Sequence, residues 1–168
     1  MKIKILFPLL ALLLANTAQG ASLPLKKTHV FDDWVLYESL KGNKKECHAM
    51  SLPYRTRAFY GVKSQSWVAL NFVAYNTFTV SAHSGFDIDH NAGLLINVDT
   101  GAKISLETLD NGQIWTYSSV QDAQLINALM HGNAYFTTRS YTVTGQTALD
   151  YYSLKGFNNI IKHMNKNC

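Results

Sequence analysis

The stretch LLINVDTGAKISLETLDNGQIWTY, residues 94–117, decides the fold of this chain. Three short runs rich in apolar residues alternate here with two turn sequences that contain glycine. The runs are 94–99, 103–109 and 113–117, and the turns are Asp99-Thr100-Gly101 and Asp110-Asn111-Gly112. Such turns between short apolar runs indicate antiparallel hairpins. The stretch therefore predicts three successive antiparallel strands.

The segments before this stretch have the same β character. They are dense in aromatic and β-branched residues, which fit a pleated and half-buried surface. Strands are expected at 33–39, 46–51, 66–75 and 77–82, with the turn pair Gly42-Asn43 joining the first two. Residues 52–58 contain a proline and residues 83–92 are polar, so both segments are predicted to be loops.

The apolar spacing becomes helical after residue 118 and again near the C-terminus. A first helix is expected over residues 119–131, capped by Ser119, with an apolar face made of Val120, Ala123, Leu125, Ile126, Leu129 and Met130. Strands are expected at 133–143 and 148–152. A final helix is expected after Ser153 as cap, with an apolar face made of Leu154, Phe157, Ile160, Ile161 and Met164.

About eight short strands at regular spacing predict a mainly β protein, an antiparallel β-sandwich that carries one inserted helix and one C-terminal helix. Trp34, Trp67 and Trp115 are expected to fill or rim its core.

The N-terminal residues have the pattern of a secretory signal. Lys2 and Lys4 precede an apolar run over 5–15, and Ala18-Gln19-Gly20 offers the small residues of a cleavage site. The run is shorter than the roughly 20 apolar residues of a membrane-spanning helix. We expect a signal peptide over residues 1–20 that is cleaved near Gly20, a flexible leader over 21–30 and one domain over 31–168; an uncleaved anchor is the alternative.

The charge pattern limits the classes of partner. The chain has 15 Lys and Arg residues against 11 Asp and Glu residues, and they form no dense basic stripe. Nucleic acid is therefore not an expected partner. No later apolar run reaches spanning length, so the mature chain is expected to have no transmembrane segment and to be soluble or peripheral to the membrane. Arg55 and Arg57 beside Tyr54 suit contact with a polyanion or a solvated loop equally.

The chain has two cysteines, Cys47 and Cys168. Two thiols in an oxidising compartment most simply form one disulfide. The alternatives are a redox-active pair, although there is no Cys-x-x-Cys motif, and a bond from Cys168 to another chain.

One loop gathers several metal-ligating residue types: His83, Asp87, Asp89, His90 and Asn91. The spacing Asp87-x-Asp89-x-Asn91 imitates the start of a calcium loop, but Val98 stands where that loop needs an acid. A solvated loop with Asx-turns is the preferred interpretation. No Gly-x-Ser-x-Gly motif is present, and we expect neither catalytic residues nor a cofactor.

Several segments, in order along residues 31–168, resemble the invasion-associated locus B (IalB) family. The most specific is the closing run DYYSLKGF at 150–157, followed by an amphipathic helix and the terminal Cys168. Weaker matches are Asp33-Trp34, KKECHA at 44–49, WTYSS at 115–119 and LMHG at 129–132. The segment SAHSGFDIDH at 81–90 departs from the Gly/Pro-rich aromatic turn of the family.

The resemblance implies an immunoglobulin-like β-sandwich in the periplasm or outer envelope of a Gram-negative bacterium, with a Cys47–Cys168 disulfide. It brings no catalytic residue and no cofactor. We therefore expect a secreted, non-enzymatic binding module whose partner is an unknown component of the envelope or of a host surface. The alternatives are a structural or stress-related periplasmic factor and a metal-dependent enzyme that uses the His83–His90 loop.

Overall fold

The computed structural model describes residues 24–57, 63–89, 91–110 and 112–168. The predicted signal peptide over residues 1–20 and its cleavage site lie outside these residues. Among the helices of the described part, none has the length and apolar character needed to cross a membrane.

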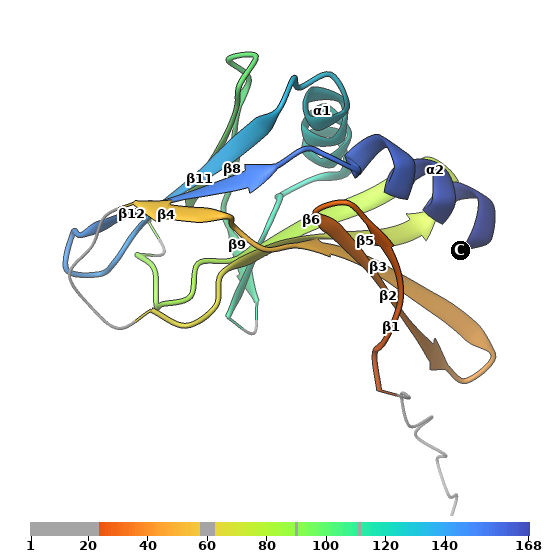
Figure 1. Ribbon diagram of the computed structural model, residues 1–168. Coiled ribbons are helices and arrows are strands. Elements are labelled where there is room, and N and C mark those ends of the chain that lie inside the picture. Colours follow the sequence, from red (N-terminus) through yellow and green to blue (C-terminus); the bar gives the residue numbers. More distant parts are fainter. Residues whose placement is uncertain (1–23, 58–62, 90, 111) are drawn as a thin grey trace, which may run out of the picture.

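Two antiparallel sheets build the molecule (Figure 1). The seven-stranded sheet has the order β1 (Lys26–Phe31), β2 (Trp34–Lys41), β3 (Lys44–Ser51), β5 (Trp67–Ala74), β6 (Thr77–His83), β10 (Gln113–Trp115) and β9 (Thr108–Asp110). The five-stranded sheet has the order β4 (Arg55–Arg57), β12 (Thr147–Ser153), β11 (Tyr135–Tyr141), β7 (Leu94–Val98) and β8 (Lys103–Leu106). The helices are α1 (Ser119–Met130) and α2 (Phe157–Asn167). The predicted β-sandwich with one internal and one C-terminal helix is confirmed.

Alternation along the strands builds one core between the layers. In β7 and β12 every second residue is buried, as the two-residue period of a strand requires. Trp34 is fully buried in this core, and its Nε1 donates a hydrogen bond to the carbonyl oxygen of Ser153, 3.1 Å away. Trp67 and Trp115 are only partly buried, so these two rim the core.

The stretch that decides the fold forms its two hairpins, but its middle strand is divided. Residues 103–109 were expected to be one strand, whereas β8 pairs with β7 in one sheet and β9 pairs with β10 in the other. The chain crosses between the sheets at Glu107, whose amide donates to the carbonyl oxygen of Trp115. Leu106 is the last residue of this run whose side chain is buried in the core. Every residue of β9 is exposed, so burial does not keep β9 in the five-stranded sheet with β8.

Two predicted non-strand segments contain edge strands. The predicted leader over 21–30 is wrong from Lys26 onward, because Lys26–Phe31 forms β1 and pairs with β2. The predicted loop over 52–58 includes β4, which pairs with β12. Both are edge strands with mostly exposed side chains, so backbone pairing holds them and their sequences lack the alternation that marks a half-buried strand.

The N-cap of helix α1 lies one residue before the predicted cap. Ser118, not Ser119, is the N-cap, and its Oγ accepts a hydrogen bond from the amide of Gln121. Asp122 in the first turn is buried and accepts hydrogen bonds from the Val80 amide and the Thr116 hydroxyl. This carboxylate fixes α1 to β6, so the helix turns Leu125 and Leu129 into the core and leaves Val120 and Met130 exposed.

Helix α2 begins at a glycine, where the prediction placed a serine cap. Gly156 is the N-cap with φ of 89°, a left-handed conformation that favours glycine. A Cβ at this position would collide with the carbonyl oxygen of Phe31, so the close approach also requires glycine. The predicted apolar face is confirmed for Phe157, Ile160, Ile161 and Met164, which are all buried. Leu154, its fifth predicted member, is buried but precedes the helix.

A disulfide joins Cys47 in β3 to Cys168 at the end of α2, with their Cα atoms 6.1 Å apart. The predicted intrachain disulfide is confirmed, and the alternative of a bond from Cys168 to another chain does not apply. Figure 1 shows α2 beside α1, with the C-terminus returning toward the seven-stranded sheet.

We expect the variant Cys47→Ser/Cys168→Ser to be less stable than the oxidised protein by about 4–5 kcal/mol, because the bond closes a loop of 121 residues. Urea unfolding with and without reductant measures this difference. An unchanged urea midpoint in both the double variant and the reduced wild type would contradict the prediction.

Gly156→Ala is expected to lower the free energy of unfolding by about 1–3 kcal/mol more than Gly145→Ala. Both glycines have positive φ, but a Cβ at Gly145 meets no atom within 4 Å, whereas one at Gly156 meets β1. Gly145→Ala is therefore a matched control for backbone strain alone. Equal urea midpoints for the two variants would show that the contact with Phe31 is not restrictive.

Candidate functional site

The His83–His90 loop is not assembled as a metal site by the described residues. His83 Nδ1 accepts a hydrogen bond from the Gly85 amide at 3.0 Å, and its ring stacks on Trp67. Asp89 Oδ1 accepts from the Asn91 amide at 2.9 Å, which is the Asx-turn expected of a solvated loop. Asp87 is exposed, and His90 lies outside the described residues. In the described ranges, no cluster of three metal-ligating groups includes His83, Asp87 or Asp89.

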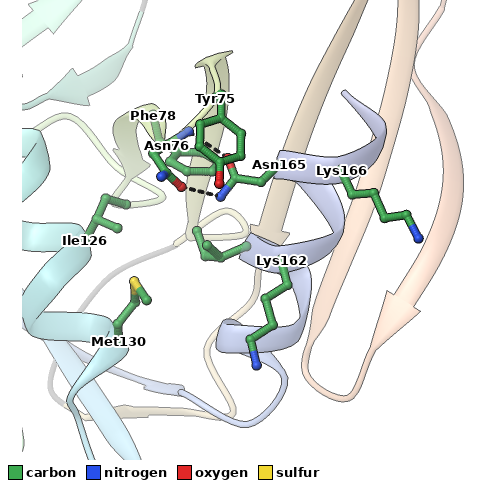
Figure 2. A pocket seen from close by; sticks show the side chains of 9 residues that line it. Tyr75, Asn76, Phe78, Ile126, Met130, Lys162, Asn165 and Lys166 are labelled. Atoms are coloured by element: carbon green, nitrogen blue, oxygen red, sulfur yellow. Dashed lines mark hydrogen bonds between the residues drawn. The ribbon is translucent and has the colours of Figure 1, made fainter.

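A groove of about 710 Å³ lies between the two helices and the β5–β6 turn (Figure 2). Its lining is mostly apolar, and Lys162 and Lys166 lie along the α2 side. One end is closed where Asn76 and Asn165 join through two hydrogen bonds, from the Asn76 amide to Asn165 Oδ1 and from Asn165 Nδ2 to Asn76 Oδ1. The groove offers apolar contact and two ammonium groups, but no converging polar set that would fix the orientation of a small ligand.

The outer face of the five-stranded sheet carries a denser set of functional groups. The strand registers place side chains in two rows across this face, because directly opposed residues point to the same side. The first row is Arg55, Tyr151, Thr137, Asn97 and Lys103, and the second is Arg57, Leu149, Arg139, Leu95 and Ser105. We call these two rows, with Tyr54 and Tyr135 beside them, the arginine–tyrosine face.

Tyr151 is the centre of this face. The guanidinium groups of Arg55 and Arg57 lie 5.5 and 5.9 Å from its ring centroid, within the range of cation–π contact. The rings of Tyr54 and Tyr135 lie on its two sides, at 6.3 and 6.0 Å. Four strand spacings of about 4.8 Å give the rows a width of roughly 19 Å.

No acidic side chain of the described residues pairs with the cations of the face. Arg55, Arg57, Lys103 and Arg139 are exposed, and none takes part in an ion pair among the described residues. The nearby Asp99 directs its carboxylate to three backbone amides, those of Asn133, Ala134 and Tyr135. Partial burial acts to raise the pKa of Asp99, but these amide hydrogen bonds outweigh it and lower the pKa. Its charge is therefore held by the backbone and not by the arginines.

An ion pair beneath the face supports β12. Asp150 is buried, and both of its carboxylate oxygens accept from Lys63 Nζ, at 2.6 and 2.5 Å. The Thr56 hydroxyl of β4 donates to the same carboxylate at 2.6 Å. Burial and the charge of Asp150 both raise the pKa of the neighbouring Tyr152, which therefore stays neutral. These contacts hold β4 against β12 and keep Tyr151 on the outer side.

Sequence reasoning identified part of this face. The group of Tyr54, Arg55 and Arg57 was noted as a possible contact for a polyanion. Arg139, Lys103, Tyr135 and Tyr151 were missed, because they lie on strands that become neighbours only through the sheet order. The alternation in β11 marks Arg139 as outward, but no local signal says which strands lie beside it.

A scan against protein-family models, a search of curated proteins and a search of solved structures each find no match to this chain.

The ion pair predicts a coupled effect on stability. Lys63→Met is expected to cost about 3–5 kcal/mol, because it leaves the Asp150 carboxylate buried without a cation. Lys63→Met/Asp150→Asn is expected to lose less than the single variant, since both charges are then removed. Urea unfolding of the two single variants and the double variant measures the coupling; strictly additive losses would contradict it.

Proposed function

We propose that this protein is a non-enzymatic binding module of the bacterial envelope, exported by its N-terminal segment, and that the arginine–tyrosine face binds an anionic polysaccharide. The observation that carries the proposal is the segregation of charge on this face. Three arginines and one lysine point outward in two adjacent rows, and all four are exposed and without ion pairs in the described part of the chain.

The chemistry of these side chains suits carboxylate or phosphate groups carried on sugar rings. Guanidinium groups bind carboxylates and phosphates through paired hydrogen bonds. Tyrosine rings add a flat apolar surface with a polar edge, which fits the face of a pyranose ring. Because the rings of Tyr54 and Tyr135 both lie close to Tyr151, beside the arginines, a chain of charged sugars meets both kinds of group.

We also propose that the chain is of the invasion-associated locus B type. Two observations support this family proposal. The cysteine pair that the resemblance implies is bonded, and the closing run at 150–157 leads from a sandwich strand into the C-terminal helix, as in the resemblance. A component of the envelope or of a host surface, as the resemblance suggests, fits an anionic polysaccharide partner.

The binding test uses the variant Arg55→Ala/Arg57→Ala and polygalacturonate, a polymer of carboxylated sugars. The variant should bind at least about tenfold more weakly than the wild type, since each hydrogen bond to a charged group contributes about 1.5–3 kcal/mol. Wild-type binding should also weaken as salt rises, because these cations are exposed and screened. Isothermal titration at two salt concentrations measures both effects.

The matched control is Lys41→Ala/Lys44→Ala, which removes the same charge from the exposed β2–β3 hairpin. It should bind polygalacturonate as the wild type does, and methyl-esterified polygalacturonate should bind to neither protein. Equal losses in the two variants would refute a role for the arginine–tyrosine face. Tighter binding of a single-stranded oligonucleotide would refute the polysaccharide assignment, and no binding of any polyanion would favour a structural envelope factor.

A further inference from the structure

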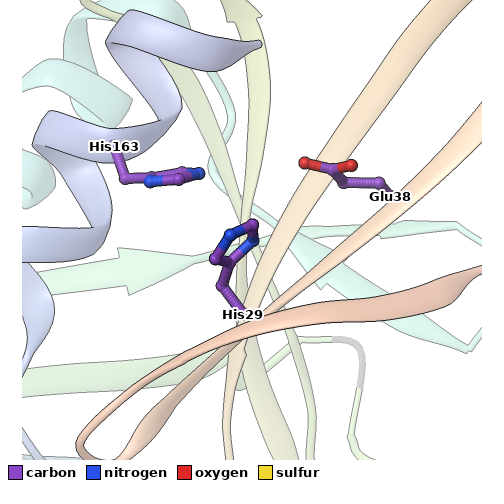
Figure 3. Close-up of side chains that lie close together, drawn as sticks. All are labelled: His29, Glu38 and His163. Atoms are coloured by element: carbon purple, nitrogen blue, oxygen red, sulfur yellow. The ribbon is translucent and has the colours of Figure 1, made fainter.

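Three metal-ligating side chains, two from the first β-hairpin and one from the last helix, converge beside α2 (Figure 3). His29 comes from β1, Glu38 from β2 and His163 from α2. Their ligand atoms all lie within 4.8 Å of one another. In Figure 3 the two imidazole rings and the carboxylate point toward a common centre.

A β-bulge directs His29 to this centre. Lys27 pairs with Tyr37, but His29 pairs with Leu36, so Thr28 is the extra residue of β1. Because side chains alternate along a strand, the extra residue moves His29 to the face shared by Leu36 and Glu38. That face is the one that α2 covers, and the imidazole centroids of His29 and His163 lie 4.6 Å apart.

Packing holds the ring of His163 beside the cluster. The ring lies against Phe31 of β1, with centroids 5.1 Å apart. This contact keeps the imidazole on the side of α2 that faces β1.

We propose that His29, Glu38 and His163 form a Zn²⁺ site. Two histidines and one glutamate are a known zinc ligand set, and it leaves a fourth position for water. Tetrahedral ligands with bonds of about 2.0–2.2 Å stand roughly 3.4 Å apart, so the three side chains need to move inward by only about 1 Å. The sulfur atoms of Cys47 and Cys168 lie near Glu38 but are bonded to each other, so they are not ligands.

Lys45 competes with the metal for Glu38. Its Nζ lies 2.8 Å from Glu38 Oε1 and also donates to the carbonyl oxygen of Asn167. The lysine side chain is 36% exposed, so it can turn into solvent when a cation binds the carboxylate. Zn²⁺ at this position would link the first hairpin, formed by β1 and β2, to α2 at the other end of the sequence.

The test measures Zn²⁺ binding by isothermal titration, with Co²⁺ absorption as the spectroscopic readout. The protein is the processed chain with its disulfide intact and without a polyhistidine tag. His29→Ala and Glu38→Gln should each weaken Zn²⁺ binding at least about tenfold. Loss of a group that only hydrogen-bonds to a metal ligand already costs about that much affinity, and these two residues are ligands themselves. Lys45→Met should strengthen binding by about fivefold, because it removes repulsion between close charges in water.

The matched control is His131→Ala, which removes an exposed imidazole at the end of α1, away from the cluster. It should bind Zn²⁺ with wild-type affinity and give the same Co²⁺ spectrum. His29 is exposed on an edge strand, so its variant should fold, and far-ultraviolet circular dichroism checks this. The proposal is overturned if the wild type binds no Zn²⁺, if folded His29→Ala binds as the wild type does, or if His131→Ala loses as much.

Discussion

The disulfide between Cys47 and Cys168 is the constraint on which the arrangement around α2 depends. Without it, the last helix would be held by its apolar face, by the turn at Gly156 and by a few exposed hydrogen bonds such as those between Asn76 and Asn165. The bond fixes the end of α2 to the seven-stranded sheet, and Gly156 lets its start approach β1 closely. With both ends fixed, His163 faces His29 and Glu38, and Lys162 and Asn165 line the groove beside α1.

The two sheets differ in what packs against them. The seven-stranded sheet is associated with both helices, since α1 packs on β6 and α2 contacts β1 and β2. The five-stranded sheet carries exposed cations and tyrosines on its outer side, and its inner side joins the core. In β12, Asp150 and Tyr152 point into the core and Tyr151 points to the outer side. Lys63 pairs with the buried Asp150 on the core side of this strand. The two rows of the arginine–tyrosine face therefore lie on paired strands and not on a loop.

The sequence predicted the central strands well and the edges poorly. β7 and β12 alternate between buried and outward residues along their whole length, β2 does so over residues 34–37, and runs of apolar residues mark all three in the amino-acid order. β1 and β4 are held by backbone hydrogen bonds to a neighbour, and backbone groups leave no signature in side-chain composition. The cap of α1 was also not predictable from local sequence, because Ser118 and Ser119 are equivalent candidates. The hydrogen bond from the Val80 amide of β6 to Asp122 decides between them.

The sequence alone predicted the antiparallel β-sandwich and its two helices, because local periodicity and turn residues carry that information. The cysteine count favoured one disulfide but left open whether Cys168 bonds within the chain. Only the tertiary structure decided which side chains meet. His29, Glu38 and His163 come together through a bulge, a strand pairing and a helix docked by a disulfide. Arg139 and Lys103 join Arg55 and Arg57 through the strand order. Such contacts depend on long-range pairing, whose free energy is a property of the whole fold and not of any local segment.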